Sequence, residues 1–175
     1  KIENLDSNFK NSSFENFSLE NWKDDLSVSL TGSFLMTKHF GSLMFKNKKG
    51  GVILNISSDL GIIGPDQRIY EGTIDNKNNR YYKPVSYSVV KSGLIGLTRY
   101  TATYWPKKIR CNVLCPGGIE NNQDKNFLKK VSDKIPIGRL AKDSELNGII
   151  VFLLSDASSY MTGAIINVDG GRTAW

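Results

Sequence analysis

The 175-residue sequence is poor in several residue types, and each scarcity argues against a class of protein. It has two cysteines, Cys111 and Cys115, whose spacing in a strand would place their α-carbons roughly 13 Å apart, too far for a disulfide. The single histidine, His39, has no companion at ligand spacing, so we expect no metal site. No apolar run is long enough to cross a membrane. These scarcities favour a protein of the reducing cytoplasm.

The charge balance is basic, with 23 Lys and Arg against 17 Asp and Glu. The basic residues are scattered in short groups such as KNKK and PKKIR, and no RRM, zinc or helix-turn-helix signature accompanies them. We therefore expect no nucleic-acid partner, and a solvated surface that favours anionic small molecules. A basic anion-binding or nucleic-acid-binding module is the alternative, and salt-dependent binding to oligonucleotides would support it.

The apolar pattern predicts alternating helices and strands. A helix is expected from Ser18, which suits an N-cap, to about Asn47, and the apolar run GGVILNIS after it suits a strand buried on both faces. Further helices are expected over 85–104, 124–133 and 143–155, and further strands over 109–115 and 163–171. This order indicates a doubly wound α/β fold with a parallel sheet and helices on both faces, over a single domain spanning 1–175.

Tyr87 and Lys91 lie four residues apart in the segment YSVVK, inside the helix expected over 85–104. A phenol has a pKa near 10, and a fixed ammonium within about 4–6 Å favours the phenolate form. A hydroxyl from Ser57 or Ser58, at the end of the preceding strand, could hold a substrate oxygen beside it. Together these groups suit reversible interconversion of an alcohol and a carbonyl.

The spacing of this pair is weak evidence alone, because Tyr104 and Lys108 share it. Pro106 lies between those two residues, so no helix can place them on one face. The expected position of Tyr87 and Lys91 near the ends of the strands is a second argument for a catalytic pair. The strands are expected to end in NISSDLG and CPGGIENN, and ligands of open parallel sheets bind beyond the carboxyl ends of the strands.

Several motifs in order resemble the short-chain dehydrogenase/reductase family. They are NISS with Gly61, YSVVK, PGGI and SDASSYMTGAIINVDGG, at family-like separations over most of the chain. The resemblance implies an NAD(P)-dependent oxidoreductase with NAD or NADP as cofactor. It implies that Ser58 orients the substrate carbonyl, that Tyr87 is the acid/base and that Lys91 binds the nicotinamide ribose. It places the other cofactor contacts at Ile56, Ser57, Pro116, Gly117, Gly118 and Ile119.

The chain departs from the family pattern in two places. Ser29 stands in VSLTG where the family has the Asn of a VNLTG-like motif, so the proton relay to Lys91 is in doubt. No Gly-rich phosphate turn is present, and pyrophosphate binding needs such backbone donors. We therefore expect that Lys1 begins partway through a Rossmann-like domain, without its first strands, and that these residues alone bind dinucleotide poorly and are inactive.

The long connection over 59–83 bears on the substrate. With PDQRIYEGT, PGGIENNQ and DGGRTAW, it resembles bacterial oxidoreductases of flagellin and surface-sugar modification. The resemblance implies a sugar or sugar derivative, such as a nucleotide sugar or a sugar phosphate. Arg68, Tyr70 and Asn121 could contact it, with Arg68 suited to a phosphate; a solvated loop is the alternative for each.

Two further expectations concern packing and partners. Trp22, Phe34 and Phe40 are expected to fill core or helix-packing positions. Ser88, Ser92 and Gly96 recur at spacing four and suit a close helix approach. The family resemblance implies that their helix contributes to a subunit interface, so a homo-oligomer, a dimer or tetramer, is expected. A non-catalytic partner subunit is the other alternative, favoured by Ser29 and by the missing turn.

Overall fold

The computed structural model describes residues 12–74, 78 and 80–175, and in them the chain forms one three-stranded parallel sheet. The strands are β1 (Gly51–Ile56), β2 (Ile109–Pro116) and β3 (Ile165–Val168), in that spatial order. Gly51 pairs with Ile109, and Val113 pairs with Ile165. Within these residues, we find no helix with the length and apolar character needed to span a bilayer.

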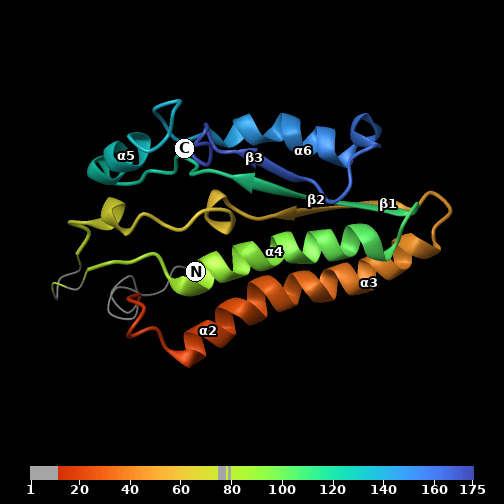
Figure 1. The fold of residues 1–175 in the computed structure, drawn as a ribbon, viewed down its shortest axis with the longest axis horizontal. Helices are drawn as coiled ribbons and strands as arrows, with labels where there is room; N and C mark the ends of the chain where they lie inside the picture. Colours follow the sequence, from red (N-terminus) through yellow and green to blue (C-terminus); the bar gives the residue numbers. More distant parts are fainter. Residues whose placement is uncertain (1–11, 75–77, 79) are drawn as a thin grey trace.

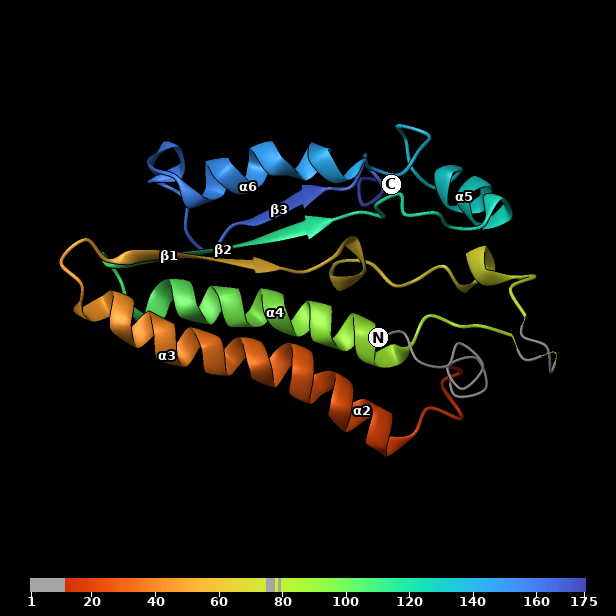
Figure 2. The same ribbon diagram turned by 180° about the vertical axis from the view of Figure 1, so that it is seen from behind.

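Helices cover both faces of the sheet (Figures 1 and 2). They are α2 (Leu19–Asp25), α3 (Gly32–Lys46), α4 (Val85–Tyr104), α5 (Lys125–Ser132) and α6 (Asn147–Leu154). Both views place α4 along one face with α3 outside it, and α6 along the opposite face. This is a partial Rossmann-like fold, and it confirms the α/β class predicted from the sequence.

The helix expected over 18–47 is three segments rather than one. Ser18 caps α2 as expected, with its hydroxyl oxygen accepting the N–H of Asn21 at 3.1 Å. A π-helix, η1 (Leu26–Thr31), then separates α2 from α3. Leu30 of this segment packs closely on α4, because a Cβ added at Gly93 would come within 3.0 Å of its side chain. Within the described residues, η1 therefore approaches α4 closely at Gly93, whereas Gly96 is exposed and has nothing within 4 Å of an added Cβ.

The central strand β2 forms the middle of the core. Its residues from Cys111 to Cys115 are all fully buried, as expected for a parallel strand covered on both faces. Asn112 satisfies its amide there, donating to the carbonyl of Met161 at 2.9 Å and accepting the N–H of Ala164 at 3.0 Å. Both cysteines are free thiols, and burial raises the pKa of Cys111 to about 11.

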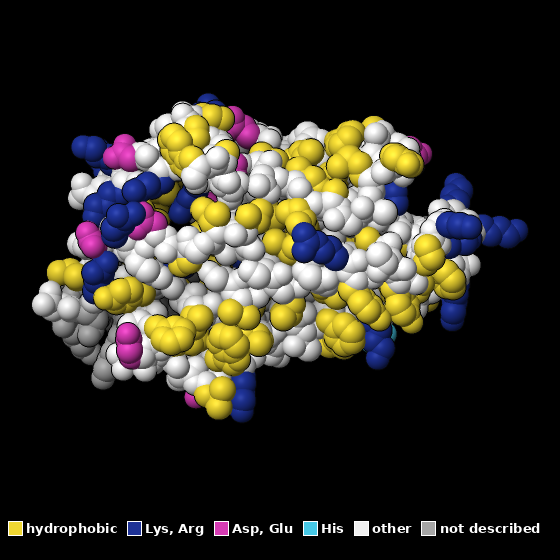
Figure 3. Space-filling view, in the orientation of Figure 1, with side chains coloured by type: hydrophobic (Ala, Val, Ile, Leu, Met, Phe, Trp, Pro, Cys, Tyr) yellow, Lys and Arg dark blue, Asp and Glu magenta, His cyan; other side chains and the backbone are white. Residues whose placement is uncertain are grey.

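The outward face of α3 is apolar and open. Phe34 and Phe40, expected at core or helix-packing positions, are 48% and 50% exposed and so do not lie in the core of the described residues, while Trp22 is half-buried. The reason is that α3 lies outside α4, and in the described residues no further layer covers it. Figure 3 shows hydrophobic side chains gathered over this side of the molecule.

Candidate active site

A cavity of about 310 Å³ lies at the carboxyl ends of the strands. Residues that follow β1 and β2 line it, and α4 contributes Tyr87 from its first turn. Its polar lining is formed by Ser57, Ser58, Asp59, Tyr70, Lys83, Tyr87, Gln123 and Arg172. Ser58 and Tyr87, which were predicted to act together, therefore face the same cavity. The edge of the sheet on which they lie is the one at which open parallel sheets bind ligands.

Ser58 is held by a short chain of charged and polar groups. Its hydroxyl donates to Oδ1 of Asp59 at 2.7 Å and accepts the N–H of Leu60 at 3.2 Å. Oδ2 of Asp59 accepts a hydrogen bond from the Arg172 guanidinium at 2.9 Å. Both charged side chains are nearly inaccessible, with 4% of Asp59 and 8% of Arg172 exposed. A buried ion pair thus fixes the loop that carries Ser58.

Lys91 is anchored below the cavity by backbone groups of β1 and its loop. Its Nζ donates to the carbonyl of Ile56 at 3.2 Å and lies 5.6 Å from the centroid of the Tyr87 ring. The hydroxyl of Ser57 donates in turn to the carbonyl of Lys91 at 2.7 Å. Burial lowers the pKa of Lys91, because an ammonium is less well solvated there. The structure brings Ser57, Ser58, Tyr87 and Lys91 to one place.

Gly61 permits this close packing of the β1 loop on α4. A Cβ added at Gly61 would lie 2.6 Å from Oγ of Ser57 and 2.9 Å from the backbone of Lys91. Real Cβ contacts are not that short, so a side chain there would force the loop away from the helix. The glycine that follows the NISS motif is therefore explained by close packing.

Lys83 is a cavity residue that the sequence reading missed. Its Nζ lies 3.8 Å from the centroid of the Tyr87 ring, closer than that of Lys91. Burial lowers the pKa of Lys83, and the charge of Asp59 opposes this shift. Asp59 and Arg172 were missed as well. A signal existed for all three, since each charged residue flanks a motif that was recognised: Lys83 precedes YSVVK, Asp59 follows NISS and Arg172 follows VDGG.

Three of the other predicted residues lie outside the cavity lining. Arg68 is exposed, and its guanidinium pairs with Asp66 at 2.8 Å. Asn121 is exposed, with its N–H donating to Gln123 at 2.6 Å. Ser29 is exposed in the π-helix η1. The short polar loops carrying Arg68 and Asn121 satisfy their own groups locally, which the sequence pattern did not reveal.

Tyr70 lines the cavity, as predicted for a substrate contact, but it is also part of a hydrophobic cluster. Its ring lies 5.2 Å from that of Tyr81 and 5.7 Å from that of Phe127, between ring centroids. Burial raises the pKa of Tyr70 to about 12. The phenol is therefore a neutral hydrogen-bonding group at physiological pH.

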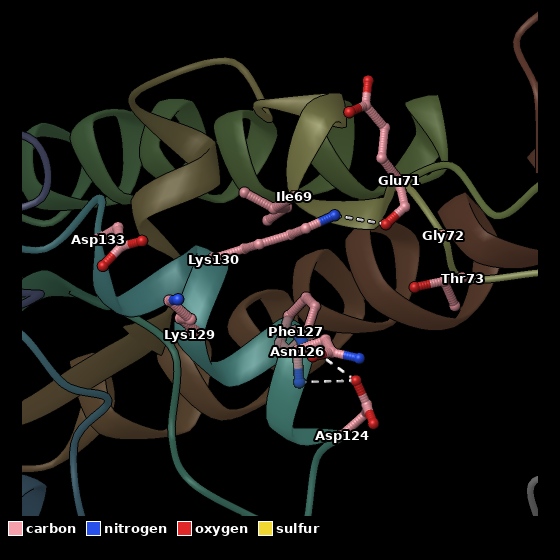
Figure 4. A pocket seen from close by; sticks show the side chains of 10 residues that line it. All are labelled: Ile69, Glu71, Gly72, Thr73, Asp124, Asn126, Phe127, Lys129, Lys130 and Asp133. Atoms are coloured by element: carbon pink, nitrogen blue, oxygen red, sulfur yellow. Dashed lines mark hydrogen bonds between the residues drawn. The ribbon is translucent and has the colours of Figure 1, made fainter.

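Helix α5 covers the cavity and is tied to the long connection. It packs on the 3₁₀-helix η3 (Gln67–Tyr70) through the cluster formed by Ile69, Tyr70, Val131, Ile135 and Leu140. Lys130 donates to the carbonyl of Glu71, as Figure 4 shows, and Lys134 pairs with Asp66 at 3.3 Å. A second cavity of about 370 Å³ lies nearby, and its lining includes Lys129 and Asp133 (Figure 4).

The turn after β2 shows what could hold the nicotinamide part of a dinucleotide. Gly117 donates its N–H to the carbonyl of Val168 at 3.0 Å, and an added Cβ would lie 2.9 Å from Cα of Asp169. Pro116 and Ile119 are half-buried beside it, and Ile56 at the end of β1 is 45% exposed. An exposed apolar side chain beside the Lys91 ammonium fits a flat, partly charged ring with its ribose.

A parallel sheet with helices on both faces, and with Ser, Tyr and Lys at its strand ends, defines the class of Rossmann-like oxidoreductases. The comparisons with known proteins agree. A family model described as enoyl-(acyl carrier protein) reductase matches residues 5–173. The chain therefore belongs to the short-chain dehydrogenase/reductase family.

Individual relatives give the extent of the similarity. The chain is 36% identical to an uncharacterized oxidoreductase of Thermotoga maritima over 91% of this chain and 61% of the relative. It is 33% identical to a 2-dehydro-3-deoxy-D-gluconate 5-dehydrogenase of Dickeya dadantii, over 90% of this chain and 59% of the relative. A crystal structure of a short-chain dehydrogenase from Leptospira borgpetersenii with bound NAD+ matches with a TM-score of 0.82 and 36% identity. The match covers 91% of this chain and 59% of the solved one. The chain thus spans about three fifths of the length of these relatives.

Proposed function

We propose that the full-length protein is an NAD(P)-dependent oxidoreductase that interconverts an alcohol and a carbonyl on a sugar or sugar derivative. The observation that supports it best is the shared cavity of Ser58 and Tyr87, with the Lys91 ammonium anchored 5.6 Å from the Tyr87 ring. A hydroxyl, a phenol and an ammonium at one sheet edge suit proton exchange with a substrate oxygen. The similarity to enzymes of this family supports the same interconversion of an alcohol and a carbonyl.

In this proposal the Ser58 hydroxyl holds the substrate oxygen, and Tyr87 gives it a proton or takes one from it. Lys91 stabilises the phenolate through its charge. The bound NAD(P) supplies or accepts the hydride. Relatives with solved structures bind NAD+ or NADP. The residues proposed to hold the nicotinamide half are Ile56, Ser57, Tyr87, Lys91, Pro116, Gly117, Gly118 and Ile119.

The choice of a sugar derivative has separate support. Among the relatives are dehydrogenases named for 2-dehydro-3-deoxy-D-gluconate, alongside acyl carrier protein reductases, so substrates differ between relatives of equal similarity. The cavity of about 310 Å³ has several hydroxyl and charged groups in its lining, beside apolar residues such as Leu60 and Phe127, and these polar groups suit a hydroxylated ligand. We therefore keep Tyr70 as a substrate contact, and a sugar phosphate or nucleotide sugar as the substrate proposed. The narrower similarity to flagellin and surface-sugar enzymes rests on sequence motifs alone.

The replacement of Tyr87 by Phe in the full-length protein tests the reaction. It should lower turnover of a panel of sugars and sugar acids by roughly 10²- to 10⁴-fold, because the acid/base is lost. Cofactor binding, followed by NADH or NADPH fluorescence, should persist. Tyr104→Phe is the matched control, since Tyr104 has the same spacing to a lysine but is 57% exposed outside the cavity. Normal turnover in Tyr87→Phe would refute the proposal, and a full-length protein that binds no nicotinamide would favour a non-catalytic partner subunit.

A further inference from the structure

Lys83 places an ammonium at the reacting end of the cavity. Its backbone is fixed by the Gln67 side chain, whose Oε1 accepts the N–H of Lys83 at 2.9 Å and whose Nε2 donates to its carbonyl at 3.2 Å. Pro84 follows directly and begins the approach to α4. The side chain then lines the cavity, with Nζ 3.8 Å from the centroid of the Tyr87 ring. The position of this charge is thus set by the fold and not by a free surface loop.

The other cations around the cavity already have oxygen partners. Arg172 pairs with Asp59 at 2.9 Å, and Lys134 pairs with Asp66 at 3.3 Å. Lys130 donates to the carbonyl of Glu71, and Lys91 donates to that of Ile56. Within residues 12–74, 78 and 80–175, Nζ of Lys83 forms no ion pair and no hydrogen bond; its close neighbour is an aromatic ring.

The charges that line the cavity do not balance. They are two cations, Lys83 and Arg172, and one carboxylate, Asp59. Asp59 is already engaged, because Oδ1 accepts from Ser58 and from the N–H of Leu60 while Oδ2 accepts from Arg172. One positive charge is therefore left facing the cavity.

A half-buried ammonium without an oxygen partner is unfavourable unless something compensates it. The lowered pKa of Lys83 reflects this loss of solvation. An anionic group of a ligand would restore both the hydrogen bonds and the charge balance, and such charge-assisted bonds are stronger than neutral ones.

We propose that Lys83 binds an anionic group of the substrate, a carboxylate or a phosphate, and so determines that this cavity accepts charged sugar derivatives in preference to neutral polyols. The inference rests on the oxidoreductase function proposed above and deepens it. Because Lys83 lies against Tyr87, the anionic group is bound near the reacting alcohol and not at the far end of a long ligand.

Calorimetric binding to the full-length protein, saturated with nicotinamide cofactor, tests this assignment. The probes are D-sorbitol, D-gluconate and D-sorbitol 6-phosphate, which share a hydroxylated six-carbon chain and differ in the charged group. Lys83→Met should weaken binding of the preferred anion by about 10- to 100-fold and leave the affinity for D-sorbitol unchanged. Lys83→Arg should retain most of the affinity. Lys129→Met is the matched control, because Lys129 faces the neighbouring cavity and should affect no probe.

The pattern of outcomes separates the alternatives. A preference for D-gluconate identifies a carboxylate, and a preference for D-sorbitol 6-phosphate identifies a phosphate. The inference is overturned if the wild type binds neither anion more tightly than D-sorbitol, or if Lys83→Met changes anion affinity by less than about twofold. Turnover is measured in parallel. If the protein shows no preference for an anion but its turnover still requires Tyr87, only the anion site is overturned and the proposed reaction stands. Anion binding that requires Lys83, without turnover that requires Tyr87, supports the site and overturns the proposed reaction.

Discussion

Breaking the buried ion pair between Asp59 and Arg172 should be costly. The two groups are 2.9 Å apart, with 4% and 8% of their side chains exposed, so neither can turn to water when the other is removed. In Arg172→Met the carboxylate of Asp59 loses its cation inside the protein. Removal of one partner of a buried pair costs about 3–5 kcal/mol. That is a large part of the roughly 5–15 kcal/mol by which domains are stable.

Urea unfolding of the full-length protein, followed by circular dichroism, would measure this loss as a change in the free energy of unfolding. The double variant Asp59→Asn with Arg172→Met should lose less than Arg172→Met alone, because a neutral pair leaves no buried charge without a partner. Arg139→Met is the comparison, since Arg139 and Glu145 form a slightly shorter but more exposed pair at 2.7 Å. Solvent and salt screen such a pair, so its loss should be small.

The reasoning is refuted if Arg172→Met lowers the free energy of unfolding by less than about 1 kcal/mol, against the 3–5 expected for a buried pair. It is also refuted if Arg139→Met costs as much, because burial would then not be the cause. A large loss in Arg172→Met that the double variant does not relieve would mean that pairing with Asp59 is not how Arg172 stabilises the fold.

Three further predictions follow from burial and close packing. Burial lowers the pKa of Lys83 in the folded protein below its value in the unfolded chain. At a pH below both pKa values the lysine is protonated in both states, and its buried charge destabilises the fold. Lys83→Met should therefore raise the melting temperature of the ligand-free protein at pH 7, with a gain that disappears as the pH rises past about 10.4, where free lysine is neutral; a loss at pH 7 would contradict this. Burial raises the pKa of Tyr70 to about 12, so the stability it contributes is complete below about pH 10 and declines as the pH rises towards 12. Urea unfolding at pH 9 and 11 should show that decline in the wild type and a smaller one in Tyr70→Phe, and equal declines would count against it. Gly61→Ala should cost about 1–3 kcal/mol through its clash with Ser57, measured by thermal unfolding, whereas Gly96→Ala, with nothing within 4 Å, should be neutral or stabilising; similar losses in both would show that crowding is not the cause.

The backbone layout was largely predictable because burial leaves periodic patterns. The continuous apolar run of β1 and the run at β2 indicated strands covered on both faces, and the boundaries expected for the helix over 85–104 are those of α4. The π-helix η1 was not predictable in this way. It contains Leu30, which packs against Gly93, and a contact between segments more than sixty residues apart leaves no periodic pattern in the sequence.

The candidate site was predictable where residues stand in recognisable motifs, and not where tertiary contacts decide. Tyr87 and Ser58 share a cavity as the motifs suggested. The role foreseen for Arg68 was not supported by its position, because Asp66, two residues earlier, captures its guanidinium. The closeness of Lys83 to the YSVVK motif drew attention to this part of the chain, but it did not show that the side chain faces the cavity, because Gln67 across the connection fixes the backbone of Lys83.

The contact between Asp59 and Arg172 also has a consequence for biosynthesis. The two residues are 113 positions apart, and the later one must leave the ribosome before the pair can close. At translation rates of about 5–20 residues per second, the nascent loop around Ser58 waits roughly 6 to 23 s for its cation. Until then the carboxylate remains hydrated, so the serine loop should settle only after the segment that carries Arg172 has been made.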